Sequence, residues 1–279
     1  DLNINNCLDS ISIHNITGDI QIKNHLGIID IESINGRLNI INAESKVNIR
    51  NSEIFSNIDT KSFDLILRNN SGDSNILTRG GSVFLSNHQG NLSLFTNGGS
   101  VILKKCRGDF FNLKTYGELI FIEDGKSDMN LSNNSGYITL KNINGAINAQ
   151  TNEGNIDIKN HFGKLILNTN SGNLFLKDIF GSTDIKSKLG DIKIKINYES
   201  SFNDSYHSIH TLEGNIEMFV PKNLSISLTS QIGLNRSTQN ITSDVPLKFS
   251  IEKNNIVGKA NSRGGLIPII LFSKSGLIS

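Results

Sequence analysis

The chain has 279 residues, of which 27 are basic and 26 acidic, so that its formal net charge is +1; it contains no Trp and three Pro. This near-neutral balance excludes the strongly basic surface with which many proteins bind nucleic acid or an anionic membrane. No stretch approaches the roughly 20 consecutive apolar residues of a membrane span, so we expect no integral membrane segment.

A unit of nine residues recurs from Asp9 to Tyr198. Most units begin with Gly and carry apolar residues at their third and fifth positions, as in Gly154, Ile156 and Ile158. Because side chains alternate along a strand, these two apolar residues share one face and the polar residues between them lie on the other. The Gly supplies a turn or a close approach of two backbones. A short fixed period of this kind predicts an all-β, single-chain β-solenoid.

Alternate units carry different residues at the turn. One set has Asn there, as at Asn69 and Asn87, and the other set mostly has Thr, as at Thr78 and Thr96. The full repeat is therefore two units long, and each coil has two short strands that face each other. Stacked Asn side chains can form hydrogen bonds from one coil to the next. We predict a solenoid of about ten coils over residues 1–198.

Two places break the regular count. We assign the single ten-residue unit to the stretch that contains Asp124-Gly125-Lys126. In GDFFNLKTY, residues 108–116, Asn112 interrupts the inward pattern while Phe111 and Leu113 fall out of phase. An extra residue in a strand has this effect, so we predict a β-bulge there.

After Tyr198 the nine-residue period ends. Residues 199–279 contain all three prolines and longer apolar runs such as GGLIPIILF. A solenoid needs its ends covered, because an open strand edge recruits other chains. We predict that this segment is an irregular β continuation or cap of the same domain.

The fourth position of a unit should face solvent, yet in four successive coils it is apolar, at Ile66, Phe84, Ile102 and Ile120. At about 4.8 Å between neighbouring strands, these side chains would form a continuous outward stripe. Monomeric proteins seldom leave such a stripe bare. We predict either that the C-terminal segment or a long loop covers it, or that it binds a partner or another copy of the chain.

Enzymatic function would require acidic and basic groups that converge on one patch. The outward acidic residues, such as Asp73, Asp157 and Asp191, fall on different coils and faces. We therefore predict no catalytic residues and no cofactor, and we keep a carbohydrate-active enzyme only as an alternative.

No metal site is predicted either. The stretch His207-Ser208-Ile209-His210 lacks further ligands, and we expect a solvent-exposed loop there. Cys7 and Cys106 are about five to six coils apart, too far for a disulfide, and we expect small buried residues or free thiols.

Short motifs of the form SGNLFL, EGNIDI, EGNIEM and LGDIKI recur along the chain. With the tail GNIEMFVPKNLSISLTSQIG, they resemble the bacterial β-strand-repeat family of auto-transporter adhesins, also called head GIN domains. The resemblance covers most of the chain. It implies a β-solenoid on an exported or envelope-associated bacterial protein, with no shared catalytic residues to carry over.

These observations together favour a non-catalytic structural or adhesin-like protein. Its rigid, repetitive β surface would contact a protein, a glycan or copies of itself, and a self-assembling envelope or filament subunit is the first alternative. The resemblance implies an exported, periplasmic or cell-surface location, although DLNINNCLDS lacks the basic and apolar regions of a signal peptide, so we expect none in this chain.

Overall fold

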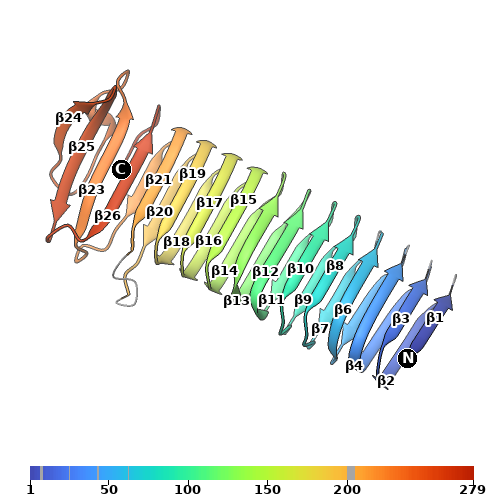
Figure 1. Ribbon diagram of the computed structural model, residues 1–279. Helices are drawn as coiled ribbons and strands as arrows, with labels where there is room; N and C mark the ends of the chain where they lie inside the picture. Colours follow the sequence, from blue (N-terminus) through green and yellow to red (C-terminus); the bar gives the residue numbers. More distant parts are fainter. Residues whose placement is uncertain (7–8, 25, 43, 62, 200–204) are drawn as a thin grey trace. The chain divides into compact units, whose positions relative to one another are not determined.

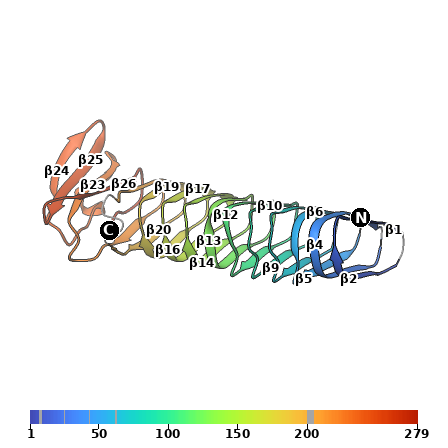
Figure 2. The ribbon, with the colours of Figure 1, turned by 60° about the horizontal axis from the view of Figure 1, so that its bottom comes forward.

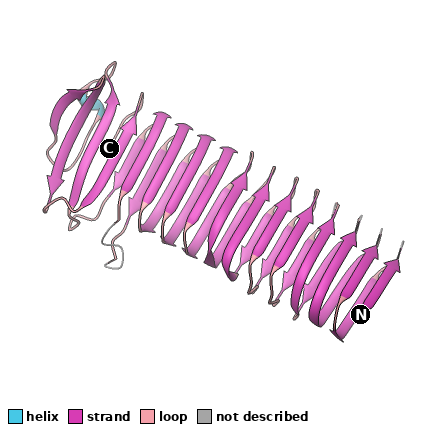
Figure 3. Ribbon diagram, viewed as in Figure 1, coloured by secondary structure: helices cyan, strands magenta, loops and turns pink. Residues whose placement is uncertain are grey.

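The computed structural model describes most of the chain, namely residues 1–6, 9–24, 26–42, 44–61, 63–199 and 205–279. Cys7 lies outside these described residues. The described chain is nearly all β-strand, with a short 3-10 helix, η2 (Thr238–Asn240), as Figure 3 shows. It divides into two compact units, residues 1–145 and 146–279.

The first unit is built from short strands that follow one another along the chain (Figure 1). Their bounds are β1 (Leu2–Asn6), β2 (Ile11–Thr17), β3 (Ile20–Asn24), β4 (Ile28–Asn42), β5 (Lys46–Arg50), β6 (Glu53–Thr60), β7 (Leu65–Arg68), β8 (Ser74–Thr78), β9 (Val83–Ser86), β10 (Leu92–Thr96), β11 (Val101–Lys104), β12 (Arg107–Thr115), β13 (Ile120–Asn133) and β14 (Ile138–Asn144).

These strands pair in parallel in two series, which we call sheet I and sheet II. Sheet I contains β1, β3, β6, β8, β10 and β12. Sheet II contains β2, β5, β7, β9, β11 and β14. β4 and β13 continue round a corner and contribute to both sheets. Figure 2 shows the chain winding between β6, β10 and β12 on one side and β5, β9 and β14 on the other.

The space between the two sheets holds the core of the first unit. In sheet I, Ile40, Ile58 and Ile76 stand in register and are at most 1% exposed. In sheet II, Leu67 and Leu85 are register partners and are 0% and 2% exposed. Each such residue contributes about 1.5–3 kcal/mol through burial. The predicted β-solenoid with 18-residue coils is confirmed.

One corner of the coils carries an Asn ladder over part of the first unit, whereas Ser33, Lys105 and Asp124 occupy the same corner in other coils. Asn51, Asn69 and Asn87 have positive φ angles of 53°, 55° and 52°, a backbone region that Asn tolerates better than most residues. The Asn69 side chain donates to Asn51 Oδ1 at 3.0 Å, and the Asn87 side chain donates to Asn69 Oδ1 at 2.9 Å. The predicted bonding between stacked corner Asn residues is therefore confirmed here.

The opposite corner is formed by buried Thr followed by Gly. Thr96 Oγ1 accepts a hydrogen bond from the Gly99 N–H at 3.2 Å and donates to the Gly81 carbonyl at 3.3 Å. A Cβ at Gly99 would lie 2.2 Å from that same carbonyl oxygen. Gly is needed here because the coils approach too closely for a side chain.

The second unit continues the same local pattern and then departs from it. Its strands are β15 (Ile147–Glu153), β16 (Ile156–Phe162), β17 (Leu165–Ser171), β18 (Leu174–Phe180), β19 (Thr183–Leu189), β20 (Ile192–Ile196), β21 (His207–Glu213), β22 (Ile216–Phe219), β23 (Ile226–Gly233), β24 (Lys248–Glu252), β25 (Asn255–Ser262) and β26 (Ile267–Ser273).

Strands β15, β17, β19 and β21 stack in parallel, as do β16, β18, β20 and β22. The last strand, β26, lies between β21 and β23 and is parallel to both. Strand β25 is antiparallel to β23, and β24 is antiparallel to β25. The boundary at 198 and the single-domain organisation stay predictions.

The expectation of an exposed loop at residues 207–210 is wrong. These residues begin β21, which pairs with β19, and His207 is only 3% exposed. Its Nδ1 lies 3.1 Å from the hydroxyl of Thr183. Burial lowers the pKa of His207 to about 4, so the ring is neutral at pH 7. The strand pattern was hidden because polar residues occupy two inward positions of β21.

We predict that Gly99→Ala destabilises the protein by about 1–3 kcal/mol, because the new Cβ would press on the Gly81 carbonyl oxygen. The neighbouring Gly98→Ala is the matched control, since its Cβ would meet nothing within 4 Å. Urea unfolding measures both variants. Equal stability of the two variants would contradict the close approach described for Gly99.

A second prediction concerns His88, which is 2% exposed and whose ring nitrogens have no hydrogen-bond partner among the described residues. Burial lowers its pKa to about 4, against the raising effect of Asp73. Between about pH 6.5 and pH 4 the unfolded chain therefore binds a proton that the folded chain does not, and stability falls as pH falls.

Replacing His88 by Ile, the residue found at the matching corner as Ile34 and Ile143, should remove this effect. The gain in unfolding free energy over wild type should grow by about 3 kcal/mol as pH falls from 7 to 4. Unfolding in urea at several pH values measures the difference. A gain that stays constant with pH would show that His88 has the same pKa in the folded and the unfolded chain.

Candidate functional site

The apolar stripe lies on the outer face of sheet II. Ile66, Phe84 and Ile102 are register partners on β7, β9 and β11. All three are half-buried, so within the first unit they keep part of their surface open to solvent. A cover formed by the C-terminal segment, the alternative considered above, stays a prediction.

The prediction that Ile120 is the fourth member of the stripe is wrong. Ile120 points inward, is 0% exposed and is the register partner of the buried Val101. Its neighbour Phe121 pairs with Ile102 and takes the outward position. We define the outer stripe as Ile66, Phe84, Ile102 and Phe121.

The cause of this error is the position of the extra residue. The register between β12 and β13 shifts between Arg107 and Phe110, so the predicted β-bulge is confirmed. The ten-residue unit therefore lies there and not at residues 124–126, as we assigned it. Because side chains alternate, a count that is one residue off exchanges the inner and outer faces, and it selects Ile120 in place of Phe121.

Charged side chains border the outer stripe. Lys104 and Lys141 place their ammonium groups 5.5 and 5.4 Å from the centre of the Phe121 ring, within the range of a cation–π contact. Lys104 also lies 3.2 Å from Glu123. The apolar surface of Phe121 is thus bordered by charged side chains that remain in contact with water.

A second charged cluster lies two coils before Phe84 on sheet II. Arg50 donates to both carboxylate oxygens of Asp30 at 2.9 and 3.1 Å and lies 3.1 Å from Glu32. The hydrogen bond from Arg50 lowers the pKa of Glu32. Such paired, exposed charges contribute little to stability. They mark the place on sheet II where the outer face changes from apolar to charged side chains.

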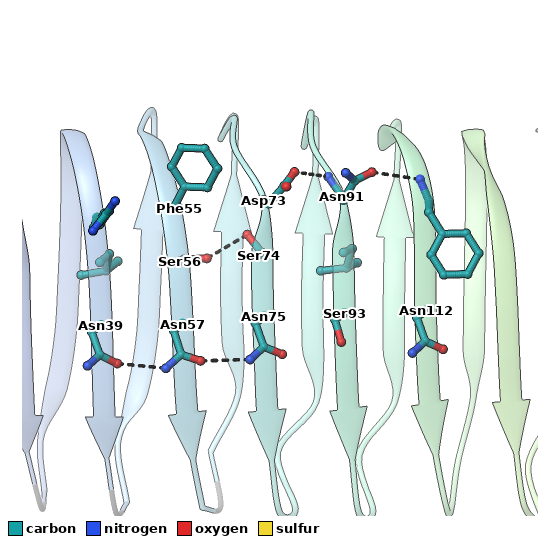
Figure 4. Close-up of a pocket in the computed structure, with 14 residues that line it drawn as sticks. Asn39, Phe55, Ser56, Asn57, Asp73, Ser74, Asn75, Asn91, Ser93 and Asn112 are labelled. Carbon is teal, nitrogen blue, oxygen red and sulfur yellow. Dashed lines mark hydrogen bonds between the residues drawn. The ribbon is translucent and has the colours of Figure 1, made fainter.

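Sheet I carries a different surface, a shallow groove that the sequence analysis missed. The groove holds about 670 Å³ and follows β4, β6, β8, β10 and β12 across their outer face. Its floor is a row of polar side chains, one from each strand. These are Asn39, Asn57, Asn75, Ser93 and Asn112, five of the residues drawn in Figure 4.

The amides on this floor bond to one another. Asn57 donates to Asn39 Oδ1 and Asn75 donates to Asn57 Oδ1, each at 3.1 Å, as Figure 4 shows. Behind the floor, the buried hydroxyl groups of Ser56 and Ser74 are 2.8 Å apart. The row is therefore ordered before any ligand arrives.

Two aromatic rings project along one side of the groove, one near each end. Phe55 is 64% exposed and Phe110 is 48% exposed. Between them, Asp73 accepts a hydrogen bond from the Asn91 N–H at 2.7 Å. Asn91 Oδ1 in turn accepts from the Phe110 N–H at 2.9 Å, which fixes the backbone that carries this ring. The signal in the sequence was Phe55 itself, an aromatic residue at the second, outward position of its unit.

Other reactive groups do not form a site. Cys106 is a buried free thiol, and burial raises its pKa to about 11, so it is not reactive at neutral pH. Among the described residues, no group of three or more His, Cys, Asp or Glu side chains is placed to hold a metal ion. In the described part of the chain, no helix has the length and apolar character needed to cross a membrane.

Comparison with protein families gives a match over part of the chain. Residues 126–263 match the sequence model of a family described as Toastrack DUF4097. Neither the curated proteins nor the solved structures include a match. Over residues 126–263, the chain is thus similar to a β-repeat family of unknown function.

Proposed function

We propose that this chain is a non-catalytic structural or adhesin-like protein that presents a rigid β surface to a binding partner. The partner is a protein, a glycan or another copy of the chain. The observation that carries the proposal is the outer stripe, because Ile66, Phe84, Ile102 and Phe121 stand in register on one face.

A surface of this kind suits binding better than catalysis. Each side chain of the outer stripe belongs to a separate strand of a hydrogen-bonded sheet, so little conformational entropy is lost when a partner packs on it. Aromatic and aliphatic side chains at the centre of a patch, with charges at its rim, are the usual composition of a protein interface. Lys104 and Lys141 provide such a rim around Phe121.

The proposal includes export to the bacterial envelope, at the periplasm or the cell surface. Its support is the resemblance of SGNLFL and EGNIDI to repeats of envelope-associated proteins. A repetitive rigid surface is useful at such a location because every coil adds area without adding a flexible joint.

We predict that the outer stripe is a contact between copies of the chain. Wild type should then associate as its concentration rises, and Phe84→Asp should be a folded monomer, because a buried carboxylate at the centre of an interface is costly. Light scattering gives the solution mass, and thermal melting shows that the variant is folded.

Leu77→Asp is the matched control, since Leu77 is a half-buried, outward residue of β8 on sheet I. It should leave the solution mass unchanged. A wild type that is monomeric at every concentration, together with a Phe84→Asp variant that has no melting transition, would show that the stripe is internal packing and not a contact surface.

A further inference from the structure

We propose that the groove on sheet I binds a strand of an uncharged polysaccharide. This inference rests on the proposed function and narrows its ligand to one chemical class. It uses three properties of the groove, namely its aromatic side, its row of amides and its balance of charge.

The aromatic side fits the apolar faces of sugar rings. Phe55 and Phe110 occupy the same column of sheet I, and Asp73 and Asn91 separate them. Three strand intervals place the two rings about 14 Å apart along the sheet. The side chains of Asp73 and Asn91 stay low because they accept hydrogen bonds from backbone N–H groups of the next coil. The two rings project from the sheet, and the side chains between them do not. An extended ligand can therefore contact one ring at each of its ends.

The row of amides fits hydroxyl groups. Asn57 uses one N–H and one lone pair of its side chain for its neighbours Asn39 and Asn75. An amide has a second N–H and a second lone pair, which remain for a ligand. A sugar hydroxyl both donates and accepts, so it can satisfy the two free positions at once. The row repeats at the strand spacing of about 4.8 Å, and its order is set in advance, which reduces the entropic cost of binding.

The charge balance favours a neutral ligand. Of the described residues that line the groove, Arg37 and Asp73 are the ionisable ones, and their charges cancel. The groove therefore offers no net attraction to an anionic ligand. In the described part of the chain, β6, β8 and β10 are each paired on both sides, so an added peptide strand would find no free edge on them to pair with.

Affinity gel electrophoresis tests the proposal with the whole chain. The gels contain one of four neutral polysaccharides, namely hydroxyethyl cellulose, glycol chitin, galactomannan or dextran, or the acidic polysaccharide alginate. We expect at least one neutral polysaccharide to retard the wild type. Phe55→Ala and Phe110→Ala should each weaken this binding about tenfold or more, as truncation of a central aromatic residue does at other interfaces.

Two further variants keep the test specific. Tyr137→Ala removes a ring that is 58% exposed in the first unit but does not line the groove, and it should bind like wild type. Phe55→Tyr keeps the ring and should also bind, which separates loss of stacking from loss of folding. Asn57→Leu should weaken binding while both rings remain in place.

Several results would overturn the inference. They are the absence of retardation by every neutral polysaccharide, retardation by alginate alone, and an equal loss of binding in Tyr137→Ala. The same samples are assayed for new reducing ends. Cleavage of the polysaccharide would contradict the non-catalytic function but would still identify the groove as the binding site. The absence of binding would refute the role of the groove and would leave the proposed protein contact at the outer stripe unaffected.

Discussion

The backbone hydrogen bonds between one coil and the next determine everything else in the first unit. The Leu65 N–H donates to the Ser82 carbonyl at 2.9 Å, and the Val83 N–H donates to the Ser100 carbonyl at 2.8 Å. This ladder holds each residue beside the residue one coil further on. Every position of the repeat therefore becomes a column, and a residue is selected for its fit with its own neighbours in that column. Core Ile, corner Asn and close-packed Gly all follow from this one constraint.

The β-bulge at residues 108–110 shows how a single added residue can create function-bearing surface. It gives Asn91 two N–H groups to bind, those of Asp109 and Phe110, where a regular coil would offer one. Phe110 is thereby turned outward while Phe111 remains at 0% exposure. On the next strand, half a coil further along the chain, the same insertion brings Phe121 to the outside of sheet II. Both candidate surfaces thus depend on one irregularity, in agreement with the frequent position of bulges beside binding sites.

Much of this architecture follows from the sequence because the repeat is local. The period of nine, the inward Ile and Leu columns and the Asn corner can each be found by counting along the chain. Ile120 could not be placed in this way, since the count is the same wherever one extra residue is inserted between Gly90 and Gly145. His207 was misjudged because its burial depends on pairing with Thr183 and not on its own polarity. The groove was missed because its lining comes from five strands, and only the register between them brings Phe55 and Phe110 into one column.

The order of strands at the C-terminal end has a consequence for how the chain folds. A coil of the repeat closes after 18 residues, as in the bond between Asn69 and Asn51, so such coils can form in sequence while the chain leaves the ribosome. Strand β26 is different, because it pairs with both β21 and β23 although it comes last of the three along the chain. Until Ile267–Ser273 has been synthesised, the neighbouring edges of β21 and β23 have no partner. The second unit therefore completes its folding only after translation of its final residues, and a chain cut short before them would expose two unprotected strand edges.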